Sequence, residues 1–272
     1  GSATEAFVWP EWKINIEEID LANNNILYRV NDAQVKKGTF NPDILDVKDL
    51  DLHASNISYA PENASLNISE FNFTEASGIE IDQFNLEAEL TKDQIQLTDI
   101  TFDGIGNSFN GDLQLSYSDL DALMKDPGSA SLQADLSDIN LELGEFFRFQ
   151  PDLRENEYLK NLAKSPVKGN LSINGKVDNL NLANLNLRWR NTNIKGSGSI
   201  VNAQDPENLS FNLPNVRLSS TQKDLQNFVS EADLGMQIPE KISINGSFKG
   251  NMEKVSTNAK IATTDGNINV NG

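Results

Sequence analysis

Apolar and polar residues alternate with a period of two along most of the chain. This spacing is typical of strands with one buried and one solvent-facing side, because successive strand residues point to opposite faces. Clear runs are Leu66/Ile68, Phe84/Leu86/Ala88/Leu90, Leu113/Leu115/Tyr117, Leu132/Ala134/Leu136, Leu185/Leu187/Trp189, Leu209/Phe211/Leu213 and Ile242/Ile244. Asn, Asp and Gly punctuate these runs and predict turns. The chain is therefore predicted to be mainly β.

Three segments break the alternation and predict short helices. The first covers residues 117–126 and stops at Pro127, and the second covers 144–165 and is interrupted by Pro151. The third covers 219–235, with Ser and Thr at its start and Gly at its end. These helices are expected either to lie on the sheet or plug one of its ends, or simply to connect strands.

A six-residue unit interrupts the alternation repeatedly. In Val47-Lys48-Asp49-Leu50-Asp51-Leu52 the spacing of three between Val47 and Leu50 should put them on opposite faces of a regular strand. Related units start at Ile16, Val47, Ile68, Ile81, Leu97, Leu136, Val177 and Leu213. A β-bulge would restore the face, and so would a short turn between two strands. We expect the apolar residues on both sides of the unit to face one interior, and repeated bulges to curve the sheet.

A longer repeat relates "KGNLSINGKVDNL" at 168–180 to "KISINGSFKGNME" at 241–253. Each copy introduces several alternating strands. This arrangement indicates an elongated β architecture in which each unit packs mainly on its neighbours.

Composition and charge narrow the function classes. The 272 residues are 38% hydrophobic and 7% aromatic, which indicates a folded chain with a thin core. The net charge of −18 comes from 22 basic and 40 acidic residues, and no stretch is expected to concentrate Lys or Arg on one face. This argues against nucleic acid as a partner and against a basic patch for anionic lipid head groups.

Chemistry-bearing residues are few. The chain has no cysteine, which excludes disulfides and thiol catalysis, and its one histidine, His53, is expected on the polar face beside Asp51. A solvated His53 is the expected state, with a ligand or base as the alternative. Paired carboxylates such as Glu87/Glu89 are interpreted as a solvated face, with a glycosidase pair or a calcium site as alternatives. We therefore expect no catalysis, no metal and no cofactor.

The segments "WKINIEEIDLANNNILYRVND" (12–32), "NLSINGKVDNLNL" (170–182) and "AKIATTDGNINVNG" (259–272), with the bulge units, resemble the TamB-like branch of the AsmA family in its Bacteroidetes-type form. The resemblance implies a long β-sheet folded like a taco, with an apolar groove that bridges the periplasm. It also implies an inner-membrane anchor, an outer-membrane BamA-like barrel as partner, and a role in phospholipid transport or outer-membrane protein assembly.

The resulting hypothesis is an elongated, curved, antiparallel-rich sheet folded into a hydrophobic groove that conducts phospholipid passively. Residues 1–11 are interpreted as a cloning scar and linker; groove segments cover 12–143, 166–218 and 236–272, and helical inserts cover 144–165 and 219–235. The residues expected to line the groove are aliphatic or aromatic: Leu113, Leu115, Leu132, Leu136, Ile173, Val177, Leu182, Leu185, Leu187, Ile200, Ile242, Ile244 and Phe248. The alternative is a structural β-solenoid or sandwich of a surface adhesin, with its inner face packed shut.

Overall fold

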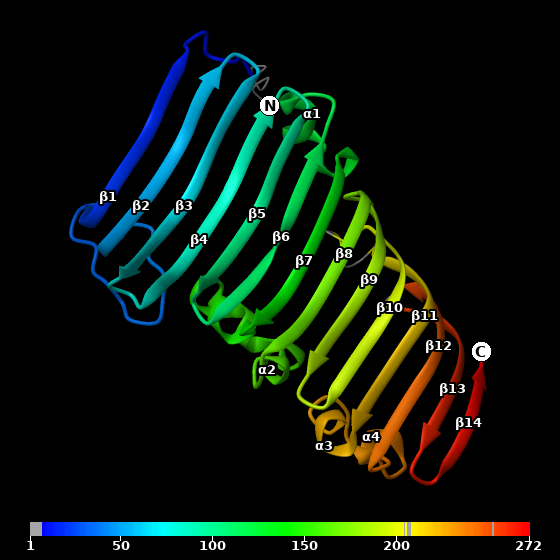
Figure 1. The fold of residues 1–272 in the computed structure, drawn as a ribbon. Helices are drawn as coiled ribbons and strands as arrows, with labels where there is room; N and C mark the ends of the chain where they lie inside the picture. The colour runs from blue at the N-terminus through cyan, green and yellow to red at the C-terminus, as the bar shows by residue number, and fades with distance from the viewer. Residues whose placement is uncertain (1–6, 204, 206–207, 252) are drawn as a thin grey trace. The chain divides into compact units, whose positions relative to one another are not determined.

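The computed structural model describes residues 7–203, 205, 208–251 and 253–272. Fourteen strands form an open antiparallel sheet in which strand order follows chain order (Figure 1). The strands are β1 (Ile14–Arg29), β2 (Ile44–Ala60), β3 (Asn63–Glu75), β4 (Ile79–Thr91), β5 (Gln94–Gly104), β6 (Asn107–Ser116), β7 (Ser131–Leu141), β8 (Val167–Lys176), β9 (Asn179–Trp189), β10 (Thr192–Val201), β11 (Ser210–Thr221), β12 (Lys241–Asn251), β13 (Val255–Thr263) and β14 (Gly266–Asn271). The prediction of a mainly β chain is confirmed.

The helices are short and lie where the alternation breaks down. They are α1 (Leu120–Lys125), η1 (Pro127–Ser129), η2 (Leu143–Arg148), η3 (Pro151–Glu155), α2 (Glu157–Leu162), α3 (Gln222–Leu225) and α4 (Glu231–Leu234). Pro127 ends the first segment as predicted, because its ring cannot continue a helix, and opens a 3₁₀ turn. Among the described residues, no helix has the length and apolar character needed to cross a membrane. Of the predicted linker, residues 1–6 lie outside the described residues, and 7–11 have no regular secondary structure.

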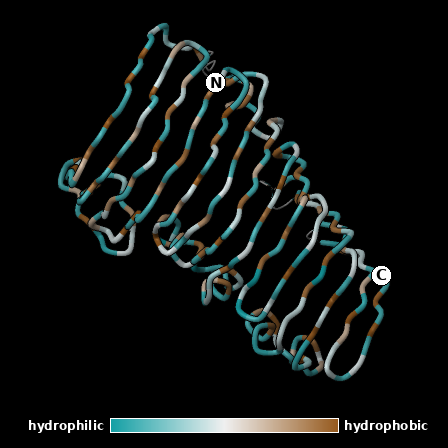
Figure 2. Tube along the Cα trace, in the orientation of Figure 1, coloured by the Kyte–Doolittle hydropathy of each residue, from teal (hydrophilic) through white to brown (hydrophobic). Residues whose placement is uncertain are grey.

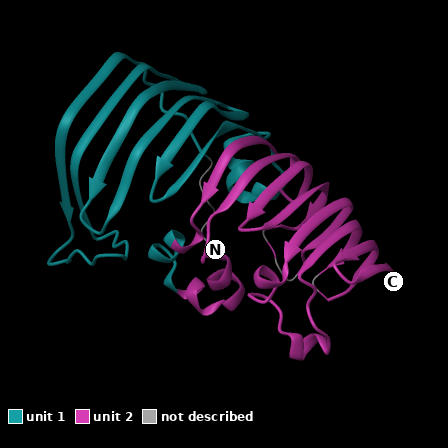
Figure 3. Ribbon diagram, turned by 60° about the horizontal axis from the view of Figure 1, so that its bottom comes forward, with its two compact units in different colours: residues 1–131, 145–151 teal, residues 132–144, 152–272 magenta. Residues whose placement is uncertain are grey.

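The chain divides into two compact units, coloured separately in Figure 3. Unit 1 comprises residues 1–131 and 145–151, and it contains β1–β6. Unit 2 comprises residues 132–144 and 152–272, and it contains β8–β14 and nearly all of β7. The strands of each unit bend along their length in Figure 3.

Strand register shows what the six-residue unit does. Val47 pairs with Glu75 of β3, and Leu52 pairs with Phe71 of the same strand. Because Phe71 and Glu75 are four residues apart in a strand, they lie on one face, and so do their partners Val47 and Leu52. The register shift between Lys48 and Asp51 is the bulge that makes this possible.

The same test succeeds in four further copies. Leu97, Ile100 and Phe102 pair with Leu113, Gly111 and Phe109, which alternate along β6 and share a face. The cross-strand partners of the copies starting at Ile68, Ile81 and Leu213 likewise share one face within each copy. The predicted phase reset is confirmed for these five copies.

Two copies of the six-residue unit do not form a bulge. Val177 and Asp178 form the two-residue turn between β8 and β9, the alternative that the pattern left open. The copy that starts at Ile16 runs opposite β2 without a register shift; in β1 the shift comes later, after Leu21.

Acidic and amide residues occupy the bulges because they tolerate a left-handed backbone. Asp49, Asp99 and Asp138, each at the third position of a unit, have φ of 51°, 52° and 51°. A side chain of the next strand satisfies two of these backbone N–H groups: Asp99 donates to Asp112 at 3.0 Å, and Asp138 donates to Asn170 at 3.1 Å.

Alternation and bulges together give each unit one apolar face and one polar face, and brown and teal segments alternate along every strand in Figure 2. In unit 1 the apolar face carries a row of aromatic rings, Phe71–Phe84–Phe102–Phe109, whose centroids lie 6.3, 6.1 and 5.4 Å apart. Its most buried members include Leu50, Ala54, Leu86 and Ile100. The core of each unit is thus the apolar face of a single sheet layer.

Candidate functional site

The apolar face of unit 1 contains a hollow of about 370 Å³ over β2–β5. Its lining is dominated by aliphatic side chains, and it comprises Ile57, Ser58, Ala64, Ser65, Leu66, Ala88, Glu89, Leu90, Ile95 and Leu97. Cross-strand pairs place these aliphatic residues on the same face: Leu66 pairs with Ala88, and Leu90 pairs with Ile95. The hollow can therefore hold a small apolar group.

Two residues of the predicted lining border this hollow. Leu113 pairs with Leu97 and Leu115 pairs with Ile95, so β6 extends the same aliphatic face by one strand. In β7, Leu132 and Leu136 are half-buried and alternate with the buried Ala134, which gives this strand an apolar side as well.

Unit 2 brings most of its predicted lining residues onto one face. Ile173 pairs with Leu182. Leu187 pairs with Ile194, which pairs with Leu218, which pairs with Ile244. The remaining members lie on this face too, since Leu185 pairs with Gly196, Ile200 with Phe211, Ile242 with Ser220 and Phe248 with Leu213. One of these rows, Leu187–Ile194–Leu218–Ile244, is aliphatic in every strand from β9 to β12, whereas the others include glycine or serine.

Val177 is the exception, because it lies in the β8–β9 turn and not in a strand. Strand alternation therefore does not place it on the apolar face. The predicted site also omitted the residues that line the hollow of unit 1. The alternation Leu86/Ala88/Leu90 contained that signal, whereas Ile57 reaches this face only beyond a register shift at Asn56, whose φ is 53°.

Glycines interrupt the apolar face of unit 2 at positions where the backbone of a neighbouring strand comes close. A Cβ on Gly246 would lie 2.5 Å from the Asn258 carbonyl oxygen, and one on Gly198 would lie 2.2 Å from the Asn212 carbonyl oxygen. These positions accept no side chain without movement of the neighbouring backbone.

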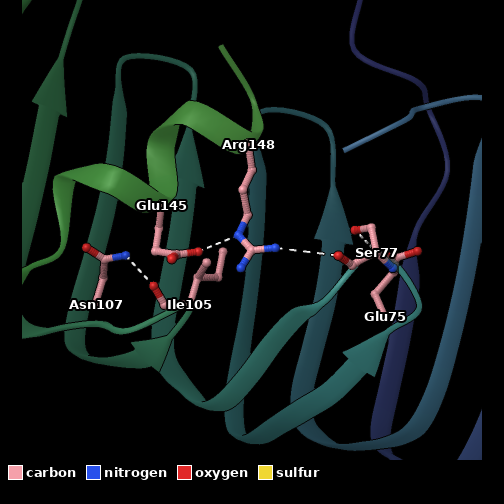
Figure 4. A network of polar contacts seen from close by, with 6 residues as sticks. All are labelled: Glu75, Ser77, Ile105, Asn107, Glu145 and Arg148. Carbon is pink, nitrogen blue, oxygen red and sulfur yellow. Dashed lines mark hydrogen bonds and ion pairs between the residues drawn. The ribbon is translucent and has the colours of Figure 1, made fainter. Parts of the chain in front are cut away.

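Polar contacts hold residues 145–151, the part of the helical insert that belongs to unit 1, at one end of this unit (Figure 4). The Arg148 guanidinium pairs with Glu145 through Nε and reaches the Ser77 carbonyl oxygen at 3.5 Å. Ser77, in the β3–β4 turn, donates its backbone N–H to the buried carboxylate of Glu75 at 2.8 Å. Next to this network the Phe40 and Phe149 rings lie 5.5 Å apart. Residues 145–151 thus pack on the strand ends of unit 1.

In unit 2 an indole anchors the inserts. Trp189 is 5% exposed and donates its Nε1–H to the Leu162 carbonyl oxygen at 2.8 Å. Its ring lies 5.3 Å from that of Phe228, and the Arg190 guanidinium carbon lies 4.6 Å from the indole centroid. The fully buried Asp224 accepts the Asn191 backbone N–H at 2.9 Å and so closes the β9–β10 turn.

His53 lies on the polar face of unit 1, opposite to the face of its neighbour Leu52. It pairs with Asp20 of β1 and with Glu70 of β3. Its Nδ1 lies 3.6 Å from Glu18 Oε1, and ligand atoms of Glu18, Asp20 and His53 lie within 4.8 Å of one another. Both carboxylates are exposed, so this group is a solvated surface cluster with three ligand atoms close together.

The polar face of strands β8–β14 is basic, contrary to what the composition of the chain led us to expect. Strands β8–β14 contain no Asp or Glu, and their basic residues all alternate with the apolar rows, so they share the polar face. These residues are Lys168, Lys176, Arg188, Lys195, Arg217, Lys241, Lys249 and Lys260. The expectation that no stretch concentrates Lys or Arg on one face is therefore wrong. The negative net charge of the whole chain gives no sign of this basic face.

Comparisons of the chain with protein-family models, with curated proteins and with solved structures find no match.

Proposed function

We propose that the apolar faces of this protein bind and conduct the acyl chains of phospholipid without chemical change. The main support is that the aliphatic row Leu187–Ile194–Leu218–Ile244 continues from strand to strand on a single open layer. No charged residue interrupts the apolar face of β8–β14. The aliphatic hollow of unit 1 supports the same use.

Elementary energetics favour this ligand. Each methylene that moves from water onto an aliphatic surface gains about 0.8 kcal/mol. Apolar contact is non-directional, so a chain that slides from one row to the next loses little at each step. A surface of this kind needs no catalytic residue.

The proposal includes the arrangement that the TamB-like resemblance implies. Bending would fold the sheet around its apolar face into a taco-like groove in the cell envelope, between an inner-membrane anchor and an outer-membrane BamA-like barrel. Assistance to outer-membrane protein assembly belongs to the same proposal. An adhesin sandwich would require a second layer over the apolar face, whereas the described strands of each unit form one layer.

The test uses a photoreactive fatty acid as an acyl-chain probe, together with lipid extraction and native mass spectrometry of the purified chain. Leu187→Asp places a charge on the apolar face, and an acyl chain must displace water from that charge to pass. We expect at least a tenfold loss of crosslinking, which corresponds to about 1.4 kcal/mol. Asn186→Asp, one residue away on the polar face, is the matched control and should retain crosslinking.

The melting temperature of both variants separates binding from folding. A folded Leu187→Asp chain with reduced crosslinking supports the conduit. Crosslinking equal to that of the wild-type chain would overturn it, and unfolding of Leu187→Asp alone would instead indicate a packed core at this face.

A further inference from the structure

The polar face of β8–β14, which the proposed lipid function leaves unused, carries a charge pattern of its own. All eight Lys and Arg residues of these strands are exposed. Within the described residues, no ion pair involves any of them. This face is therefore uniformly positive in a chain whose net charge is −18.

Two direct cross-strand pairs make the pattern unfavourable in isolation. Lys168 pairs with Arg188, and Lys195 pairs with Arg217. Like charges directly opposite each other destabilise a sheet. Strands β1–β6 hold fifteen acidic residues, yet no acidic residue pairs directly with another in the register of their described residues. The cationic pairs thus carry a cost that a bound anion would offset.

A polar hollow of about 680 Å³ lies at the second of these pairs. Its polar lining consists of the two cations with amide and hydroxyl side chains: Lys195, Arg217, Ser197, Asn215, Asn245, Ser247 and Asn258. No carboxylate lines it. Cationic donors beside neutral amides and hydroxyls suit a ligand that carries both acidic groups and many hydroxyl groups.

We propose that this face binds an anionic polysaccharide, with the hollow at Lys195 and Arg217 as its central subsite. Lys260 continues the row beyond Asn245, and Lys168 with Arg188 provides a second cationic pair nearer β8. From β8 to β13 the strand spacing spans roughly 24 Å, which accommodates several sugar units. The acidic groups bind the cations, and the sugar hydroxyls bind the Asn and Ser side chains.

Two other anionic partners fit less well. Proteins that bind single-stranded nucleic acid stack bases on aromatic rings, and the three aromatic residues of β8–β14, Trp189, Phe211 and Phe248, pair on the apolar side. A flat anionic bilayer would not fill a hollow of this size. The binding experiment therefore includes both partners as competitors of the glycans.

The experiment measures binding of a fluorescent heparin oligosaccharide and a polygalacturonate oligosaccharide to the whole chain by anisotropy, at low and at moderate salt. Lys195→Gln with Arg217→Gln should weaken binding about tenfold and reduce its salt dependence. Lys36→Gln with Lys37→Gln, an equal change of charge at exposed loop positions of unit 1, should change binding less than twofold. Circular dichroism checks the fold of each variant.

Protection of lysines from acetylation locates the ligand on the wild-type chain independently of the variants. Protection of Lys195 and Lys260, but not of Lys36, is the expected result. The proposal is overturned if neither glycan binds, if the double variant binds as tightly as the wild-type chain, or if single-stranded DNA or phosphatidylglycerol vesicles bind more tightly than both glycans.

Discussion

The strands of unit 1 and strands β8–β14 of unit 2 bend with different residues. In unit 1 several irregular strand positions are acidic or amide residues with a left-handed backbone, namely Asp49, Asn56 and Asp99. In the described part of β8–β14 the positive φ values within strands belong to glycines, among them Gly169 and Gly198, and bulges of β9 and β11 face glycines across the ladder. A left-handed residue bends its own strand, whereas a glycine lets the neighbouring strand approach.

The units also differ in how they hold their inserts. Unit 1 uses partly exposed polar contacts of Arg148, and unit 2 uses the buried indole of Trp189. Burial of a large ring contributes more than a partly exposed ion pair. The comparison therefore predicts that the same kind of mutation has unequal effects in the two units.

The largest expected effect comes from Trp189→Ala. Loss of a buried indole and its hydrogen bond should lower the free energy of unfolding by about 3–5 kcal/mol. Arg148→Ala in unit 1 should cost about 1 kcal/mol. Urea denaturation measures both, and Trp12→Ala, at a ring that is 65% exposed, is the control. Equal losses for Trp189 and Arg148 would contradict the difference between the anchors.

The next effect tests glycine in unit 2. Gly198→Ala should cost about 2–3 kcal/mol, because its Cβ would lie 2.2 Å from the Asn212 carbonyl oxygen and its φ is 151°. Gly144→Ala, where the nearest atom would be 3.8 Å away, should be nearly neutral. Thermal unfolding separates the two variants. A Gly198→Ala chain as stable as the wild type would show that this close approach is not required.

A smaller effect tests the left-handed bulge in unit 1. Asp99→Val should cost about 1–2 kcal/mol, since a β-branched residue disfavours φ near 52°. Asp99→Gly removes that strain and should stay within a few tenths of a kcal/mol of the wild type. Chemical denaturation of both variants gives the comparison. Equal stability of the Val and Gly variants would mean that backbone conformation does not select this residue.

The smallest effect concerns the acidic character of unit 1. Burial, and then the negative charge of Asp93, raise the pKa of Tyr117 above its ordinary value of 10.0. The stability that neutral Tyr117 contributes is full below pH 10.0 and is lost as pH rises through the raised pKa. Asp93→Asn should lower this pKa, as ultraviolet titration measures. Asp265→Asn in unit 2 is the charge-matched control and should leave it unchanged.

Much of the fold follows from the sequence because alternation and bulge units act locally. The spacing of Val47 and Leu50 specifies a shared face, and Pro127 and Pro151 specify where helices stop. The hollow of unit 1 could not be predicted from the alternation, because Ile57 faces it only as a result of the irregular backbone at Asn56. The basic face was missed for another reason: Lys195 and Arg217 are 22 positions apart in the chain and become neighbours only through strand register.

Since strand order follows chain order, a complete hairpin can be added or removed without changing how the remaining strands are connected. Insertion or deletion of one complete hairpin changes the sheet by two strand spacings, about 10 Å, and leaves every other strand with its original direction and face. Loss of a single strand would instead reverse the direction of all strands that follow. Because each strand pairs only with its neighbours in the chain, folding can start at any hairpin and spread to the next.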